Sequence, residues 1–112
     1  MTNKERFLAY LRCYERKDID GIAEMLSVDV VLRDWKTLVK GRSNALSETR
    51  KNFEAAKSLQ IETLRILESE NSVAGELKIV VDGDVELYVV DVLDFEPDGN
   101  ITSIRAYLGR SD

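Results

Sequence analysis

The sequence predicts an α+β domain in which three N-terminal helices pack on one face of a mostly antiparallel sheet. Up to residue 57, apolar residues recur at helical spacing around one short apolar strand. Beyond residue 57 this period stops, and runs rich in β-branched residues alternate with turn residues. A length of 112 residues is that of one domain, so we expect residues 1–112 to form a single unit.

Capping patterns and apolar stripes place the three helices. Thr2 and Glu5 form a capping box, which predicts a helix start at about residue 3. The stripe of this helix follows the i, i+3, i+4, i+7 rule and consists of Phe7, Tyr10, Leu11 and Tyr14. Asp18 opens a second helix, whose apolar residues are Ile19, Ile22, Ala23 and Leu26. A third helix is expected over 43–57 with Ser43 as its cap, and its inward positions are Leu46, Thr49, Phe53 and Ala56.

Five strands are predicted around these helices. The first covers 28–35, and its alternation places Val30, Leu32 and Asp34 on one face. Val31, Arg33 and Trp35 share the other face, and Lys36 is also expected to point away from Asp34. Four more strands are expected over 59–68, 72–81, 85–95 and 101–109. The turn signals between them are residues 82–84, which read Asp-Gly-Asp, and residues 97–100, which read Pro-Asp-Gly-Asn.

The composition argues against several classes of partner. The formal net charge is −5 and the basic residues are dispersed, so we expect no nucleic-acid binding and no attraction to anionic lipid. No apolar run approaches the length of a membrane span. One cysteine, Cys13, excludes an internal disulfide, and the N-terminus has no apolar signal segment. We therefore expect a cytoplasmic protein.

The chain contains no histidine. Catalytic schemes built on a Ser-His or Cys-His pair are thereby excluded, together with the usual zinc sites. Any acid-base chemistry must use Asp, Glu, Tyr, Lys or Cys13.

The strand over 85–95 is apolar on both faces. Leu87, Val89, Leu93 and Phe95 lie on one side, and Tyr88, Val90 and Val92 lie on the other. The helices can cover only one of these sides. A second copy of the chain is the simplest cover for the other, so we expect a homodimer through the sheet face.

Three polar residues fall on surfaces that should be buried. Tyr10 lies on the stripe of the first helix, Asp34 ends the first strand, and Asp91 interrupts an apolar face between Val89 and Leu93. Each also has a plain structural interpretation. Tyr10 could be a core residue, Asp34 a loop carboxylate, and Asp91 a carboxylate satisfied by a neighbouring group.

The order and spacing of these elements resemble the NTF2-like superfamily, including its SnoaL-like members, and within it most closely the Δ5-3-ketosteroid isomerases. The resemblance spans nearly the whole chain. Its local markers, after Tyr10, are residues 18–22 (DIDGI), 29–34 (DVVLRD), 41–42 (GR), 90–101 (VDVLDFEPDGNI) and 104–107 (IRAY). It implies a cone-shaped fold with a pocket between the helices and a curved sheet.

The resemblance also implies a cofactor-free proton transfer on a small hydrophobic ketone. The isomerase site residues fall on Asp34 as general base and on Tyr10 and Asp91 as donors to the enolate oxygen. No metal or organic cofactor is implied. The residues expected to line the substrate pocket are Trp35, Leu26, Phe53, Val89 and Leu108.

The sequence departs from the isomerase pattern around these three positions. Leu26 and Thr49 stand where supporting tyrosines are usual, Trp35 replaces a proline after the base, and Leu108 replaces an aromatic residue. Two other functions stay open on the same fold. One is a SnoaL-like polyketide cyclase, and the other is a non-catalytic module for small-molecule binding or dimerisation.

Overall fold

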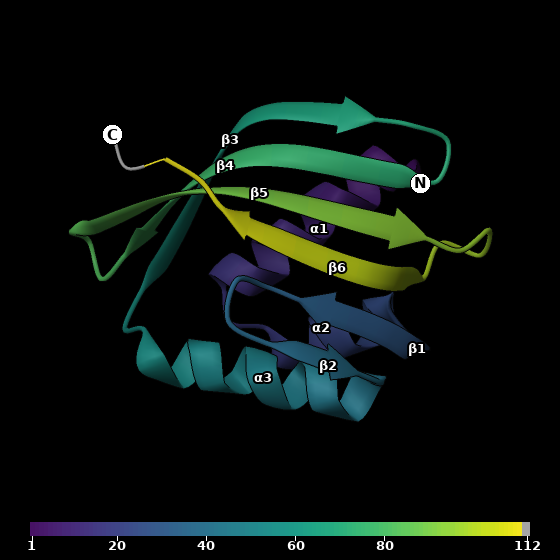
Figure 1. The fold of residues 1–112 in the computed structure, drawn as a ribbon, viewed down its shortest axis with the longest axis horizontal. Helices are drawn as coiled ribbons and strands as arrows, with labels where there is room; N and C mark the ends of the chain where they lie inside the picture. Colours follow the sequence, from purple (N-terminus) through teal and green to yellow (C-terminus); the bar gives the residue numbers. More distant parts are fainter. Residues whose placement is uncertain (111–112) are drawn as a thin grey trace.

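The computed structural model describes residues 1–110, so the last two residues of the predicted 1–112 domain lie outside it. The helices and strands follow one another as three helices interleaved with two strands and then four strands (Figure 1). Their bounds are α1 Asn3–Glu15, α2 Ile19–Met25, β1 Leu26–Arg33, β2 Leu38–Lys40, α3 Arg42–Ala55, β3 Leu59–Glu68, β4 Ser72–Val81, β5 Val85–Phe95 and β6 Ile101–Leu108. Within residues 1–110, no helix has the length and apolar character needed to cross a membrane.

Side-chain caps start the first two helices as predicted. Thr2 Oγ1 accepts the amide of Glu5 at 3.1 Å, and Glu5 Oε1 accepts the amide of Thr2 at 2.8 Å. Asp18 Oδ1 accepts the amide of Gly21 at 3.0 Å. The prediction for α3 was wrong: Gly41, at φ +91°, is the N-cap, no side chain caps this helix, and Ser43 lies inside its first turn. Glycine adopts this positive φ without strain, so the chain can turn sharply from β2 into α3.

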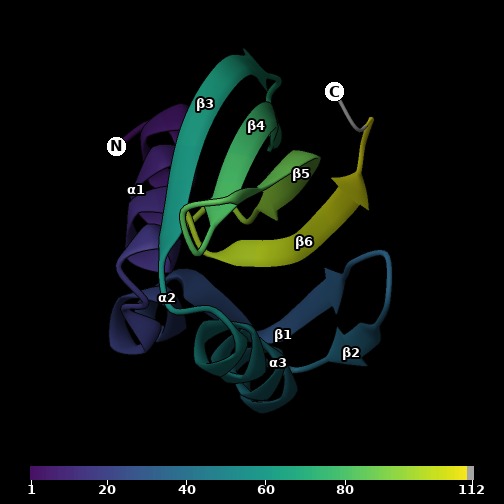
Figure 2. The same cartoon turned by 90° about the vertical axis from the view of Figure 1, so that its left-hand side faces the viewer.

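The six strands form one mixed sheet in the order β2-β1-β6-β5-β4-β3. Among the strand pairs within residues 1–110, only β1 and β6 run parallel. Helix α1 packs on β3 and β4, and α3 packs on β1 and β2, so the helices cover one face of the curved sheet (Figure 2). This arrangement confirms the predicted α+β architecture.

The first strand has the predicted length but is shifted by two residues, because it begins at Leu26 and ends at Arg33. The short strand β2, which was not predicted, folds back on it and pairs Arg33 with Leu38. Asp34 therefore lies in the turn between β1 and β2, where strand alternation no longer decides which way a side chain points. The predicted placement of Trp35 on the face opposite Asp34 fails for this reason.

Close contact between α1 and the sheet depends on Gly75 of β4. Phe7 of α1 is fully buried, and a Cβ built on Gly75 would lie 2.6 Å from its Cζ. Gly75 pairs across the strands with Asp91 of β5. Gly75, the cross-strand neighbour of Asp91, therefore leaves the space that the Phe7 ring of α1 needs to pack on the sheet.

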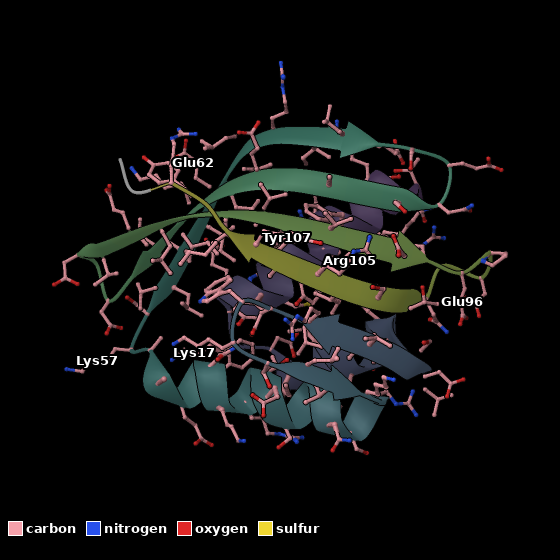
Figure 3. The ribbon with its side chains drawn as sticks, viewed as in Figure 1. Lys17, Lys57, Glu62, Glu96, Arg105 and Tyr107 are labelled. Carbon is pink, nitrogen blue, oxygen red and sulfur yellow. The ribbon has the colours of Figure 1, made fainter. Side chains whose placement is uncertain are left out.

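The sheet face away from the helices carries apolar and charged residues side by side. Tyr88, Val90 and Val92 of β5 are half-buried there, while Val89 and Leu93 on the opposite face are buried. Register places Arg105 and Tyr107 of β6 beside Val92 and Val90 on this outer face (Figure 3). Arg105 and Asp94 form a two-pronged ion pair, with nitrogen–oxygen distances of 2.7 and 3.2 Å.

Candidate functional site

A cavity of about 380 Å³ lies between α1, α3 and the concave face of the sheet. Its polar lining consists of Tyr10, Tyr14, Asp34, Trp35, Lys36, Thr49, Asn52 and Asp91. Leucine, isoleucine, valine and alanine side chains supply the rest of the wall. The volume suits a small organic ligand, and the lining combines an apolar wall with a few polar groups, as ligand pockets generally do.

Asp91 reaches the cavity from β5 between two small residues. Its cross-strand neighbours are Gly75 on β4 and Ala106 on β6, so no bulky side chain covers the carboxyl. The residue is only 9% exposed, and within residues 1–110 its carboxyl has no hydrogen-bond partner. Burial raises the pKa of Asp91 from 3.8 to about 7. Near neutral pH a large share of Asp91 therefore carries a proton and can donate a hydrogen bond into the cavity.

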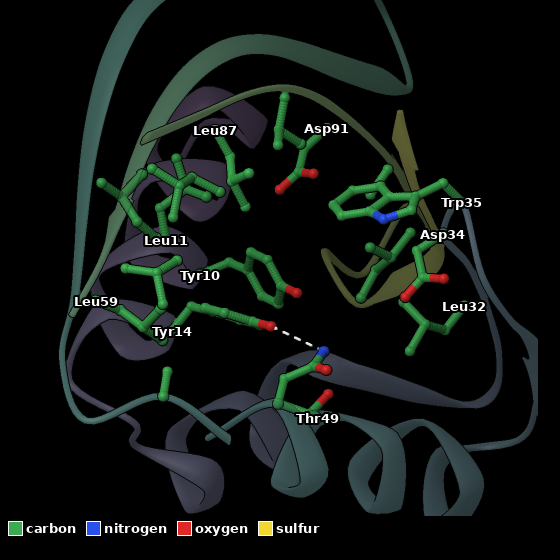
Figure 4. A pocket seen from close by; sticks show the side chains of 18 of the residues that line it. Tyr10, Leu11, Tyr14, Leu32, Asp34, Trp35, Thr49, Leu59, Leu87 and Asp91 are labelled. Atoms are coloured by element: carbon green, nitrogen blue, oxygen red, sulfur yellow. Dashed lines mark hydrogen bonds between the residues drawn. The ribbon is translucent and has the colours of Figure 1, made fainter. Parts of the chain in front are cut away.

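Tyr10 of α1 directs its hydroxyl into the same space (Figure 4). The residue is 4% exposed, and no group within the described chain pairs with its hydroxyl. Burial, followed by the nearby Tyr14 and Asp91, raises the pKa of Tyr10 well above its ordinary value. The phenol stays protonated and is a second donor aimed at the cavity.

Asp34 is both a turn residue and a pocket residue. Its Oδ1 accepts the amides of Lys36 at 2.8 Å and Thr37 at 2.7 Å, and its own amide donates to the Thr37 carbonyl at 3.0 Å. These bonds fix the carboxylate at the cavity wall. Its other oxygen, Oδ2, has no partner within residues 1–110 and is available to a ligand.

The two residues after Asp34 also line the cavity. Trp35 is 43% exposed and forms part of the rim. Lys36, predicted to point to the other face, lines the cavity instead, because the strand has already ended at Arg33. In Figure 4, Asp34 and Trp35 lie across the open space from Tyr10.

Only two of the five residues expected to line the pocket do so, namely Trp35 and Val89. Leu26 is 2% exposed and is part of the core at the start of β1. Phe53 packs edge-on against Tyr14 with ring centroids 4.9 Å apart, and so stands behind the lining residue. Leu108, at the end of β6, is 48% exposed.

The sequence analysis did not single out two polar residues of the lining, Tyr14 and Asn52. Asn52 Nδ2 donates a hydrogen bond to Tyr14 Oη at 3.1 Å, which joins α3 to α1 across the pocket wall (Figure 4). Tyr14 lies four residues after Tyr10 on the same helical stripe, so that spacing could have identified it. Asn52 follows the inward-facing Thr49 by three residues, which is a weaker signal.

Thr49 cannot act as a further donor, because its hydroxyl donates to the carbonyl of Ala45 at 2.8 Å. Within residues 1–110, no group of three or more carboxylates or cysteines is placed to hold a metal ion. The arrangement thus sets one carboxylate acceptor, Asp34, against the donors Tyr10 and Asp91. Such a set can remove a proton from a bound molecule while stabilising charge that develops on an oxygen.

Comparisons with known proteins agree with this geometry at the level of family and fold. A family model for the SnoaL-like domain matches residues 7–104. An NTF2-like protein from Cytophaga hutchinsonii superposes with a TM-score of 0.82 at 16% identity, covering 97% of this chain and 91% of that one. A candidate ketosteroid isomerase from Kribbella flavida gives 0.84 at 20% identity, with 98% and 79% covered.

A third solved structure, the epoxide hydrolase/cyclase-like enzyme SalBIII of pyran ring formation in the polyether salinomycin, gives a TM-score of 0.84 at 25% identity. The match covers 98% of this chain and 92% of that one. A comparison with curated protein sequences gave no match.

Proposed function

The chain belongs to the SnoaL-like domain family, and we propose that it is an enzyme that transfers a proton at the carbon next to a ketone without a cofactor, as ketosteroid isomerases do. The observation that carries this proposal is Asp91. It is a buried, unpaired carboxyl with a pKa of about 7, in the same cavity as the Asp34 carboxylate and the Tyr10 phenol. A carboxylic acid kept neutral in this way can act as a hydrogen-bond donor.

The proposed reaction moves one proton and one double bond. Asp34 Oδ2 takes the proton from the α-carbon, the C–H electrons form a carbon–carbon double bond, and the carbonyl oxygen becomes an enolate. Tyr10 and Asp91 donate hydrogen bonds to this oxygen. Asp34 then returns the proton to the far end of the conjugated system, so the atoms balance and no co-reactant is needed.

The turn around Asp34 supports its role as the base. Two backbone amides hold Oδ1, so the carboxylate is oriented before substrate binds and Oδ2 is left for the proton. A positioned base of this kind typically contributes about 10²–10⁴ in rate, and one oxyanion donor about 10²–10³. Fixing the geometry in advance avoids reorganisation during the reaction.

The test is isomerisation of β,γ-unsaturated ketones, both a 3-ketosteroid and the smaller cyclohex-3-enone, followed by the absorbance of the conjugated enone. Asp34→Asn should lower kcat/KM by about 10²–10⁴, and Tyr10→Phe by up to about 10²–10³. Asp29→Asn, an exposed position on β1 outside the cavity, is the matched control and should change nothing. Turnover that survives Asp34→Asn unchanged would rule out the proposed base.

A second candidate function is acid-assisted ring opening or ring closure on an epoxide. It is favoured by the pairing of a protonated Asp91 with a carboxylate at Asp34, and by the likeness to an epoxide hydrolase/cyclase-like enzyme. Here Asp91 would give its proton to the epoxide oxygen as the C–O bond breaks. Asp34 would accept the proton of the attacking hydroxyl or water.

Asp91→Asn separates the two reactions. An asparagine amide can still donate a hydrogen bond to an enolate oxygen, so isomerisation should be weakened but retained. It cannot transfer a proton, so epoxide opening should be lost. If neither substrate class is turned over while apolar ketones still bind, the remaining alternative is a binding module without catalysis.

A further inference from the structure

We propose that Tyr14 and Asn52 form a second oxygen-binding subsite, so that the natural ligand is an apolar molecule with two oxygen-bearing groups. One oxygen would be held by Tyr10 and Asp91, and the other by Tyr14. This inference rests on the proposed function only for the placement of the first oxygen. Asn52 is a positioning residue that acts through Tyr14.

The two phenols occupy separate places in one cavity. Tyr14 follows Tyr10 by one helical turn, a rise of about 6 Å along α1. Their ring centroids are 6.0 Å apart and tilted by 50°. Both hydroxyls point toward the open space in Figure 4, and both residues line it. Because the two hydroxyl donors are one helical turn apart, they suit a ligand with two oxygens better than a ligand with one.

The hydrogen bond from Asn52 decides which way the Tyr14 hydroxyl acts. A phenol has one proton to donate and an oxygen that accepts. The amide of Asn52 occupies an acceptor position at 3.1 Å, which leaves the Tyr14 proton for another group. Within residues 1–110, no protein acceptor is paired with that proton. Burial raises the pKa of Tyr14 by more than the Asn52 hydrogen bond lowers it, and Asp91 and Asp34 raise it further, so the proton is retained.

Packing alone does not account for the Tyr14 hydroxyl. The ring is held by the edge of Phe53 at 4.9 Å and by Tyr10, and a phenylalanine would make the same contacts. Asn52 is exposed on α3, where no core contact requires an amide. A purely structural role, tying α1 to α3, would affect stability but would not select between ligands.

The experiment compares binding of 2-naphthol with binding of 1,3- and 2,7-dihydroxynaphthalene by isothermal titration calorimetry. The single hydroxyl imitates the enolate oxygen, and the isomers place a second oxygen at a short or a long spacing. We expect at least one diol to bind the wild-type protein roughly 2- to 10-fold more tightly than 2-naphthol, the gain of one neutral hydrogen bond. Tyr14→Phe should abolish this gain.

Two further variants and one control sharpen the result. Asn52→Asp replaces the donating amide with a carboxylate. Tyr14 would then donate its hydrogen bond to that carboxylate and not to the ligand, so this variant should also remove the gain. Tyr10→Phe should weaken binding of all three probes and keep the ratio of diol affinity to 2-naphthol affinity. Tyr107→Phe removes a phenol hydroxyl from the outer sheet face and should leave every affinity unchanged.

A diol-to-naphthol ratio that is the same in wild type and Tyr14→Phe overturns the proposal. So does the absence of saturable binding by all three probes to the wild-type protein. Because binding does not require turnover, these results do not test the proposed function. The proposed function is tested separately, and it fails if isomerisation is unchanged by Asp34→Asn.

Discussion

Asp91 shows how a buried carboxyl can be left unpaired without disrupting the sheet. On the inner face its neighbours along β5 are Val89 and Leu93, both buried, and its neighbours across the sheet are Gly75 and Ala106. The apolar neighbours raise the cost of ionisation, while the two small residues leave the carboxyl facing a cavity. An apolar strand thus holds a carboxyl group that is still partly protonated near neutral pH.

The raised pKa of Asp91 predicts that stability falls as pH rises. Well below pH 3.8 the carboxyl is protonated in both the folded and the unfolded chain. Between 3.8 and about 7 the unfolded chain ionises while the folded chain keeps its proton, so the folded state loses relative stability up to about pH 7. The difference between a pKa of 3.8 and one of about 7 corresponds to roughly 4 kcal/mol of unfolding free energy.

Asp91→Asn removes this titration and isolates its effect. In urea unfolding at pH 4, 6 and 8, the stability of the variant relative to wild type should rise by up to about 4 kcal/mol across the series. The ion pair with Arg105 lowers the pKa of Asp94, so Asp94 also makes stability depend on pH. This contribution is the same in both proteins and cancels in the difference between their unfolding free energies. A difference that stays constant over this range would show that Asp91 is ionised in the folded state throughout.

At the level of elements, the contact of α1 with β4 decides where the Tyr10 and Tyr14 side chains stand. Phe7 fills the space above Gly75, so the helix that carries both phenols is held against the strand that flanks Asp91. Gly75→Ala would place a methyl group 2.6 Å from the fully buried Phe7 ring. Overpacking of this kind typically costs about 1–3 kcal/mol.

The expected cost of Gly75→Ala can be assigned to that one contact by a double-mutant cycle. Phe7→Leu shortens the opposing side chain, so Gly75→Ala should cost clearly less in the Phe7→Leu protein than in wild type, measured by urea unfolding. Additive effects of the two substitutions would mean that the Phe7 ring is not what an added Cβ meets.

Elements with a long apolar period were predictable, whereas short and locally bonded ones were not. The stripe of α1 and the alternation of β5 extend over many residues, and burial enforces both, so their bounds follow from the sequence. Strand β2 has three residues and exists because it pairs with β1, a contact that no local pattern encodes. Trp35 and Lys36 were misplaced because that pairing ends β1 one residue before Asp34.

The site was predictable to the extent that it rests on polar residues within apolar stripes. Tyr10, Asp34 and Asp91 all line the cavity and were recognisable on that ground, while their roles stay proposals. Asn52 gave no comparable signal, because it is exposed on α3 and meets Tyr14 only through the packing of two helices. Leu26 and Phe53 illustrate the reverse error, since an apolar residue near a pocket is more often core than lining.

At the scale of the whole molecule, no helix within residues 1–110 packs on the outer sheet face, where the Arg110 guanidinium lies 4.8 Å from the centre of the Tyr88 ring. Tyr88, Val90 and Val92 are half-buried there, and Tyr107 is 54% exposed beside Val90 (Figure 3). We propose that two copies meet through this face about a two-fold axis. In such a dimer each apolar row faces the same row of its partner, which is how symmetric interfaces become self-complementary.

Light scattering at micromolar concentration should therefore give twice the chain mass of 12.7 kDa. Val90→Glu and Val92→Glu place carboxylates on the apolar row, where pairing would desolvate like charges, so the double variant should give the single-chain mass. Ser43→Glu adds a carboxylate to the exposed start of α3, on the helical side of the molecule, and should leave the dimer intact. A wild-type protein of single-chain mass would refute the sheet-face dimer, and a dimer that persists in the double variant would place the interface elsewhere.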